Sequence, residues 1–168
     1  TTPNVVDLPL DEDGDGVAEG DGLMDLVLID HEGILSFYQR YRDRDGTLKL
    51  KEGKRIFKLN GFIWQVVKTP GGDAGKWGWR MVDWDCDGDL DVIMQGGQYE
   101  GSVYFMENIS TTPGEYNFVN RGHVHPRVIR CHEVHVSTCD WNKDGIPDIL
   151  CGDISGNIYY YLNDLSKN

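Results

Sequence analysis

The sequence lacks the features of several protein classes. Its apolar runs fall well short of the roughly 18 residues that a membrane-spanning helix needs, so we expect no membrane span. Basic residues are scarce, because 16 Lys and Arg stand against 28 Asp and Glu and give a net charge of −12. This excess of negative charge argues against nucleic acid as a partner. No convincing amphipathic helix is present either: residues 49–58 are charged, but Gly53 and the residues after it predict a hairpin and a strand.

Cysteine spacing excludes one further class of protein. The four cysteines have none of the spacings of a zinc finger, and they are Cys86, Cys131, Cys139 and Cys151. Cys139 and Cys151 are expected on adjacent strands and could approach each other, while buried free thiols are equally compatible with the sequence. Disulfide pairing therefore stays open.

What the sequence does contain is a repeated aspartate-rich segment. Residues 83–91 read DWDCDGDLD, and residues 140–148 read DWNKDGIPD. Oxygen-bearing side chains occupy positions 1, 3 and 5, Gly occupies position 6, and Asp occupies position 9. Ca²⁺ takes about 6 to 8 oxygen ligands, and a Gly at position 6 permits the sharp turn that such a loop needs. We therefore expect a calcium loop in each segment.

A more elaborate loop, the first along the chain, begins at Asp11. Counted from Asp11, position 9 is Glu19, yet the strand that matches the other repeats begins after Asp25. We expect an enlarged loop that closes with Asp25, with Glu19 and Asp21 as possible substitutes. Across all three loops, the sequence predicts two to three calcium ions. The expected ligands are Asp11, Asp13, Asp15, Asp25, Asp83, Asp85, Asp87, Asp89, Asp91, Asp140, Asn142, Asp144, Ile146 and Asp148.

Two other interpretations fit these loops less well. An EF-hand closes with an acid at position 12, but position 12 is Met94, Cys151 or Gly22 in the three loops. Asp-Gly pairs also mark simple hairpin turns. Several carboxylates converging on one turn would repel each other without a cation, which favours the calcium loop over a plain turn.

The repeat extends beyond the loops. Apolar strands follow at 26–29, 92–94 and 149–151, and glycine-led aromatic strands follow at 33–38, 101–106 and 156–161. A fourth strand is expected at 55–59 and 116–119, with no equivalent in the third repeat. The second and third loops begin 57 residues apart, and this repeat predicts an all-β fold of β-propeller blades, each with four antiparallel strands. We expect blades near 1–62, 63–122 and 123–168, the last without its outer strand.

The loop followed by an apolar strand and a glycine-led aromatic strand resembles the FG-GAP and VCBS repeats. These repeats build calcium-binding β-propellers of the integrin-α type and of many secreted bacterial proteins. The Gly-Ala-Pro of FG-GAP is replaced by residues 95–97 and 152–153, which places the chain nearer the VCBS-like branch. Weak calcium loops also suit extracellular calcium levels of about 10⁻³ M. Together these points imply an extracellular, periplasmic or cell-surface protein that binds or scaffolds glycans or other proteins.

Just under three blades cannot close a propeller of about 4 to 8 blades. Because the chain also begins at Thr1 rather than Met, we expect a single portion, residues 1–168, of a larger propeller. The expected partners are the remaining blades, or further copies of the chain through self-association.

A second group of residues suggests chemistry beyond calcium binding. Arg121, His123, His125 and Arg127 cluster in one connection, and related propellers resemble modules of polysaccharide lyases. In a lyase, Arg127 would neutralise the uronate carboxylate and His123 would take the C5 proton. A zinc site, or histidines that simply pack between blades, are the alternatives, so the sequence leaves enzyme activity open.

Two tryptophans break the repeat. Trp77 and Trp79 follow a Pro-Gly-Gly connection at 70–72. Exposed tryptophans there could stack on sugar rings, and buried ones could seal a blade interface.

Overall fold

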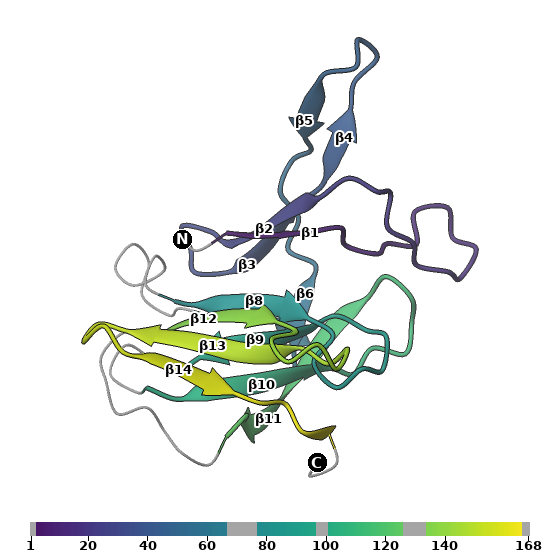
Figure 1. Ribbon diagram of the computed structural model, residues 1–168. Coiled ribbons are helices and arrows are strands. Elements are labelled where there is room, and N and C mark those ends of the chain that lie inside the picture. Colours follow the sequence, from purple (N-terminus) through teal and green to yellow (C-terminus); the bar gives the residue numbers. More distant parts are fainter. Residues whose placement is uncertain (1–2, 67–76, 97–100, 126–133, 166–168) are drawn as a thin grey trace. The chain divides into compact units, whose positions relative to one another are not determined.

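The computed structural model describes residues 3–66, 77–96, 101–125 and 134–165 (Figure 1). The strands are β1 Asn4–Val6, β2 Asp25–Ile29, β3 Leu35–Tyr38, β4 Arg40–Arg42, β5 Leu48–Leu50, β6 Phe57–Leu59, β7 Phe62–Ile63, β8 Trp79–Val82, β9 Asp91–Gln95, β10 Val103–Asn108, β11 Tyr116–His123, β12 Val134–Cys139, β13 Asp148–Asp153 and β14 Ile158–Tyr161. The all-β prediction is confirmed, with several separate sheets and none that closes on itself among the described residues. No helix in the described ranges is long and apolar enough to cross a membrane.

The chain divides into two compact units. One contains residues 1–75 and 109–118, and the other contains residues 76–108 and 119–168. The predicted blade boundaries near 62 and 122 stay a prediction. Strand β11 contributes its first residues to the first unit and its remaining residues to the second.

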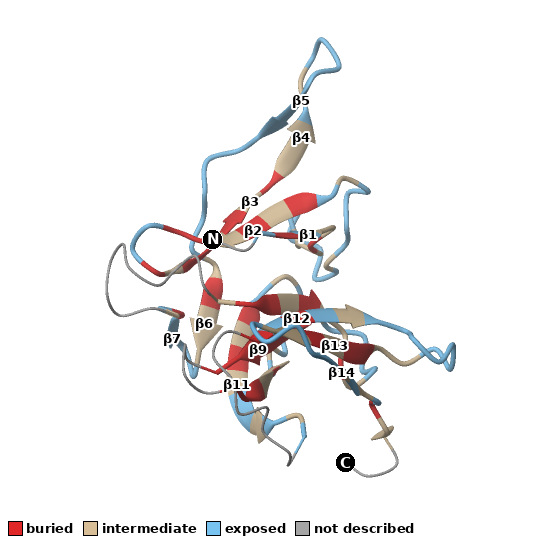
Figure 2. Cartoon of the chain, turned by 60° about the vertical axis from the view of Figure 1, so that its left-hand side comes forward, coloured by how far each residue is buried: buried red, intermediate tan, exposed pale blue. Residues whose placement is uncertain are grey.

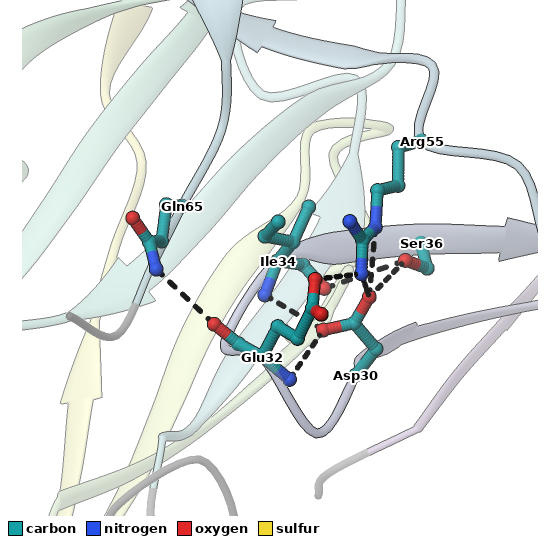
Figure 3. A network of polar contacts seen from close by, with 6 residues as sticks. All are labelled: Asp30, Glu32, Ile34, Ser36, Arg55 and Gln65. Carbon is teal, nitrogen blue, oxygen red and sulfur yellow. Dashed lines mark hydrogen bonds and ion pairs between the residues drawn. The ribbon is translucent and has the colours of Figure 1, made fainter. Parts of the chain in front are cut away.

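The first unit contains an antiparallel sheet in the order β1-β2-β3. Val27 and Ile29 of β2 are fully buried, as the alternation of a half-buried strand requires. Asp30 then turns the chain into β3 and holds a polar network (Figure 3). Its Oδ1 accepts hydrogen bonds from the Glu32 and Ile34 amides at 2.8 and 3.1 Å, and its Oδ2 accepts two from the Arg55 guanidinium at 2.8 and 3.0 Å.

The fourth strand of the first repeat forms, but its pairing differs from the prediction. Strand β6 pairs in parallel with β11, with Phe57 opposite Tyr116, and this pairing is not part of the predicted antiparallel blade. Just before β6, Lys54 forms an antiparallel bridge with Phe37 of β3. The reason for the parallel pairing is aromatic packing. Phe57 contacts Tyr116 and Phe118 at ring-centroid distances of 5.6 and 6.4 Å, and Trp64 contacts Phe118 at 5.2 Å. Burying these four rings favours a pairing that the repeat pattern did not contain.

The first unit also carries a two-stranded arm made of β4 and β5, with no further strand beside it among the described residues. All three residues of β5 are exposed (Figure 2). The charged segment 49–58 therefore forms a hairpin strand and then β6, as predicted.

The second unit contains two sheets. One has the order β11-β10-β9-β8, which supplies the four strands expected of the second repeat. The other has the order β12-β13-β14 among the described residues, and the missing outer strand of the third repeat stays a prediction. Their inner faces share one apolar core, in which strand β9 is buried along its whole length. The core residues are Trp84, Ile93, Val103, Val134, Val136, Ile149 and Cys151.

Candidate metal-binding loops

The closing aspartate of the loop at 83–91 is held by two backbone amides. Asp91 Oδ2 accepts a hydrogen bond from the Trp84 amide at 3.0 Å, and Asp91 Oδ1 accepts one from the Asn108 amide at 2.8 Å. The side chain is only 1% exposed, at the first residue of β9. One carboxylate therefore joins the start of the loop to the end of strand β10.

The loop at 140–148 repeats this arrangement. Asp148 Oδ2 accepts from the Trp141 amide at 3.2 Å and from the Tyr160 hydroxyl at 2.9 Å, while Asp148 Oδ1 accepts from the Asn163 amide at 2.9 Å. Asp148 is fully buried. The two loops thus share a framework as well as a sequence pattern.

The first positions of both loops are equivalent too. Asp83 accepts hydrogen bonds from the amides of Asp87 and Gly88, both at 3.1 Å. Asp140 accepts from the amides of the corresponding residues, Asp144 and Gly145, at 3.1 and 3.0 Å. Position 6 has a positive φ in each loop, which is why it is glycine. These side chains order the turn around the place where their carboxylates converge.

The same framework shows that the first loop begins at Asp7, a residue that sequence reasoning missed. Asp25 accepts from the Leu8 amide at 3.2 Å and from the Arg40 amide at 2.7 Å, so Leu8 takes the place of Trp84. Asp7 Oδ2 accepts from the Gly22 amide at 3.0 Å, as position 1 does from position 6 elsewhere. The sequence contained a signal for this start: Val6-Asp7 matches Val82-Asp83, where the loop at 83–91 begins.

The predicted ligands Asp11, Asp13 and Asp15 belong to a separate loop, which is nested inside the loop from Asp7 to Asp25. Asp11 accepts from the Gly14 and Gly16 amides at 2.7 and 3.2 Å. Leu10 and Glu19 exchange two backbone hydrogen bonds at 3.1 and 3.2 Å and thereby close residues 11–19. Asp11, Asp13 and Asp15 thus lie in the nested loop and Asp25 closes the outer one, and that these four residues bind calcium together stays a prediction.

Two groups of carboxylates lie close enough to hold a metal ion. Oxygens of Asp11, Asp13 and Asp15 lie within 4.8 Å of one another, and so do those of Asp83, Asp85 and Asp91. Of the other predicted ligands in this part of the chain, Asp87 and Asp89 are exposed and fall outside the second group.

The loop at 140–148 is less acidic than the loop at 83–91. Asn142 stands where the loop at 83–91 has Asp85, and its Nδ2 donates to Asp144 Oδ2 at 2.7 Å. The Ile146 amide donates to Asp144 Oδ1 at 2.9 Å. Fewer carboxylate oxygens are therefore left over in this loop for a cation.

The electrostatics of the loop at 83–91 suit a bound cation. Burial and the neighbouring Asp87 carboxylate raise the pKa of Asp85, and burial is the main cause that raises the pKa of Asp91 to about 7. Asp85 Oδ1 is buried and has no hydrogen-bond partner among the described residues, and the same is true of Asp7 Oδ1 in the first loop. A buried carboxylate oxygen without a donor is costly, and a bound cation would offset that cost.

The predicted lyase residues meet in a cleft of about 700 Å³ within the second unit. Arg121, His123 and His125 all line it, whereas Arg127 lies outside the described residues. The Arg121 guanidinium forms an ion pair with Glu107. The rest of the lining is Trp84, Asp85, Phe105, Val124, Tyr160, Tyr161, Leu162, Asn163 and Asp164.

The two tryptophans proposed for sugar stacking differ in exposure. Trp79 is fully buried in β8, so its ring is not available to a sugar, and the alternative of a buried packing role describes it instead. Trp77 is partly buried. Neither lines the cleft.

No disulfide joins Cys139 to Cys151, both of which the structure describes. The register of β12 and β13 places Asp148 opposite Cys139 and Val136 opposite Cys151. Cys131 lies outside the described residues.

Comparison of the chain with protein-family models, with curated proteins and with solved structures finds no match in any of the three.

Proposed function

We propose that this chain is a calcium-stabilised portion of an FG-GAP/VCBS-type propeller that binds or scaffolds glycans or proteins outside the cytoplasm. The observation that carries the proposal is the recurrence of one hydrogen-bond framework. In the loops that close at Asp25, Asp91 and Asp148, the last aspartate accepts two backbone amides, and position 1 accepts the amide of a position-6 glycine.

Calcium is the cation that these groups suit best. Every charged candidate ligand is a carboxylate, and hard oxygen ligands without sulfur or imidazole favour Ca²⁺ or Mg²⁺ over zinc. Mg²⁺ demands near-ideal octahedral geometry, whereas irregular loops with many carboxylates suit the flexible coordination of Ca²⁺. The ion would supply the positive charge that allows Asp83, Asp85 and Asp91 to remain ionised close together.

Calorimetry and thermal melting test this proposal. A ligand that binds only the folded state stabilises it by RT ln(1 + [L]/Kd), or about 2.7 kcal/mol at a hundredfold excess over Kd. We expect chelation to lower the melting temperature and Asp85→Ala to remove one calcium-binding event, because Asp85 belongs to the group formed with Asp83 and Asp91. Asp45→Ala is the control, because Asp45 is also an aspartate in a turn but lies outside the loops.

The proposal fails if calorimetry detects no heat of calcium binding and chelation leaves melting unchanged. Equal stabilisation by Mg²⁺ and Ca²⁺ would overturn the choice of ion. If Asp45→Ala removed a binding event as Asp85→Ala does, the assignment to the loops would be wrong.

A lyase is the second candidate, favoured by the presence of Arg121, His123 and His125 in one cleft. In that reaction His123 takes the C5 proton of a uronate, a C4=C5 double bond forms, and the C4–O bond breaks so that the leaving oxygen is protonated. Acidic polysaccharides should then yield unsaturated uronate products. His123→Ala should stop their formation without altering calcium-dependent melting, and absence of product from the intact protein leaves the binding module as the function.

A further inference from the structure

The cleft in the second unit shares a residue with a candidate metal group. Asp85 lines the cleft and also belongs to the group formed with Asp83 and Asp91. Its Oδ1 is buried without a hydrogen-bond partner among the described residues. A change in the charge of this loop therefore changes the electrostatic potential in the cleft.

Other residues of the same wall are bonded to the closing aspartates. The Tyr160 hydroxyl donates to Asp148 at 2.9 Å, and the Asn163 amide donates to the other oxygen of Asp148 at 2.9 Å. Asn163 Nδ2 donates to the Trp84 carbonyl at 2.7 Å, and the Trp84 amide donates to Asp91 at 3.0 Å. Two loops thus set the positions of three cleft residues.

The remaining polar lining consists mainly of nitrogen donors. Arg121 and His123 end strand β11, and His125 follows two residues later. Each imidazole is oriented by an aromatic ring, with His123 at 4.6 Å from Tyr104 and His125 at 4.9 Å from Tyr161, measured between ring centroids. The Arg121 guanidinium already pairs with Glu107, so the imidazole N–H groups are the main donors toward a ligand carboxylate. Aromatic side chains such as Phe105 suit the apolar face of a sugar ring.

The charge of Asp85 decides whether an anionic ligand can enter. Without a cation, ionised Asp85 and Asp164 place negative charge on the cleft and repel a uronate carboxylate. A divalent cation on the group of Asp83, Asp85 and Asp91 neutralises that charge. Calcium should therefore strengthen the binding of an acidic sugar more than that of a neutral one.

We propose that this cleft binds a uronate-containing saccharide and that its affinity is coupled to calcium in the loop at 83–91. The inference rests on the proposed function, because it requires that loop to hold calcium. It adds the place of binding, the class of ligand and a reciprocal effect: the saccharide must raise calcium affinity by the same factor by which calcium raises saccharide affinity.

Isothermal titration of the whole chain with trigalacturonate is the experiment. We expect binding at saturating calcium to be about tenfold tighter than after chelation, and calcium to bind about tenfold tighter at saturating trigalacturonate. The fully methyl-esterified trisaccharide, which lacks the carboxylate charge, should bind weakly under both conditions. Titration of calcium into trigalacturonate alone supplies the correction for chelation by the sugar.

Two histidine variants locate the site. His125→Ala should weaken trigalacturonate binding about tenfold or more and leave the heat of calcium binding unchanged in the absence of sugar. His135→Ala is the matched control, because His135 is exposed on β12 and does not line the cleft. Circular dichroism at the titration temperature shows whether each sample is folded. If the chelated protein is unfolded, the titration of calcium with and without trigalacturonate still tests the coupling.

Each alternative result has a distinct meaning. Calcium binding without any trigalacturonate binding overturns the inference and leaves the proposed function intact. Equal sugar affinity with and without calcium in a folded protein overturns the coupling, and equal binding of the methyl ester overturns the uronate class. Equal losses in His125→Ala and His135→Ala overturn the location, whereas absence of calcium binding overturns the proposed function itself.

Discussion

At the scale of single residues, the aspartates that close the loops perform a task that the repeat pattern did not predict. Both carboxylate oxygens of Asp91 accept backbone amides, from Trp84 and from Asn108. Asp25 and Asp148 do the same in their own loops. Without these acceptors the buried amides would be left unpaired, which costs free energy. These aspartates therefore stabilise the fold whether or not they also bind a metal ion.

This dual task predicts different outcomes for two neighbouring aspartates. Asp91→Ala leaves two buried amides without acceptors, and each unpaired buried group costs about 1–3 kcal/mol of unfolding free energy. Asp89→Ala removes an exposed side chain and should change the unfolding free energy by less than about 0.5 kcal/mol once calcium is chelated. Urea unfolding in the presence of a chelator measures both. Equal losses in the two variants would contradict the structural role of Asp91.

At the scale of elements, the sequence predicted the strands better than their partners. The apolar runs after Asp91 and Asp148 form β9 and β13 because alternation and β-branched residues are local signals. The parallel pairing of β6 with β11 depends on rings that are distant in sequence, such as Phe57 and Tyr116, and no local pattern reports it. Sequence reasoning missed Asp7 as the start of the outer loop. The nested loop is inserted between Asp7 and Glu19, and this insertion conceals the register of the outer loop.

The two matching tryptophans show the same limit of local pattern. Trp84 and Trp141 occupy the same position in their loops, yet Trp84 is buried in the core and Trp141 is 62% exposed. The difference comes from what packs beside each loop, which the repeat does not encode. The pattern therefore predicted the second and third loops well and predicted poorly which side chains face the core.

The loop at 83–91 also predicts an unusual dependence of stability on pH. Burial raises the pKa of Asp91 from 3.8 to about 7 in the folded chain. The folded state therefore retains a proton that the unfolded state has already released between about pH 4 and pH 7. Without calcium, this group contributes stability that is fully present below about pH 4 and is lost as the pH rises through 7. We expect the stabilisation by calcium to be larger at pH 7 than at pH 5.

Melting temperatures at pH 5 and pH 7, with calcium and with a chelator, measure this effect. Asp91→Asn should remove most of the pH dependence of the calcium-free protein. Asp153→Asn is the control, because the Asn157 side chain and neighbouring groups hold the pKa of Asp153 at about 2, below this pH range. The assignment is wrong if Asp91→Asn and the unsubstituted chain lose the same stability between pH 5 and pH 7.

At the scale of the whole molecule, sheets in both units end in edge strands that have no further strand beside them among the described residues. In the second unit, β14 is the last strand of its sheet, whereas β10 at the corresponding place has β11 beside it. The exposed edge is also apolar, since Ile158 is 80% exposed and Leu162, just beyond the strand, is 50% exposed. Apolar edge strands with free backbone groups pair with other chains. The propeller portion proposed above would pair such an edge with a neighbouring blade.

The exposed edge predicts concentration-dependent self-association through β14. Light scattering of the eluting protein should give a mass above the 19.0 kDa of one chain, rising with protein concentration. Ile158→Lys should shift the mass toward the monomer, because a charge on an edge strand opposes pairing. Ile154→Lys adds the same charge to an exposed residue in the turn of the same hairpin and should associate like the unsubstituted chain. A monomer at every concentration would contradict the prediction, and equal dissociation by both lysine variants would show that net charge, rather than strand pairing, controls association.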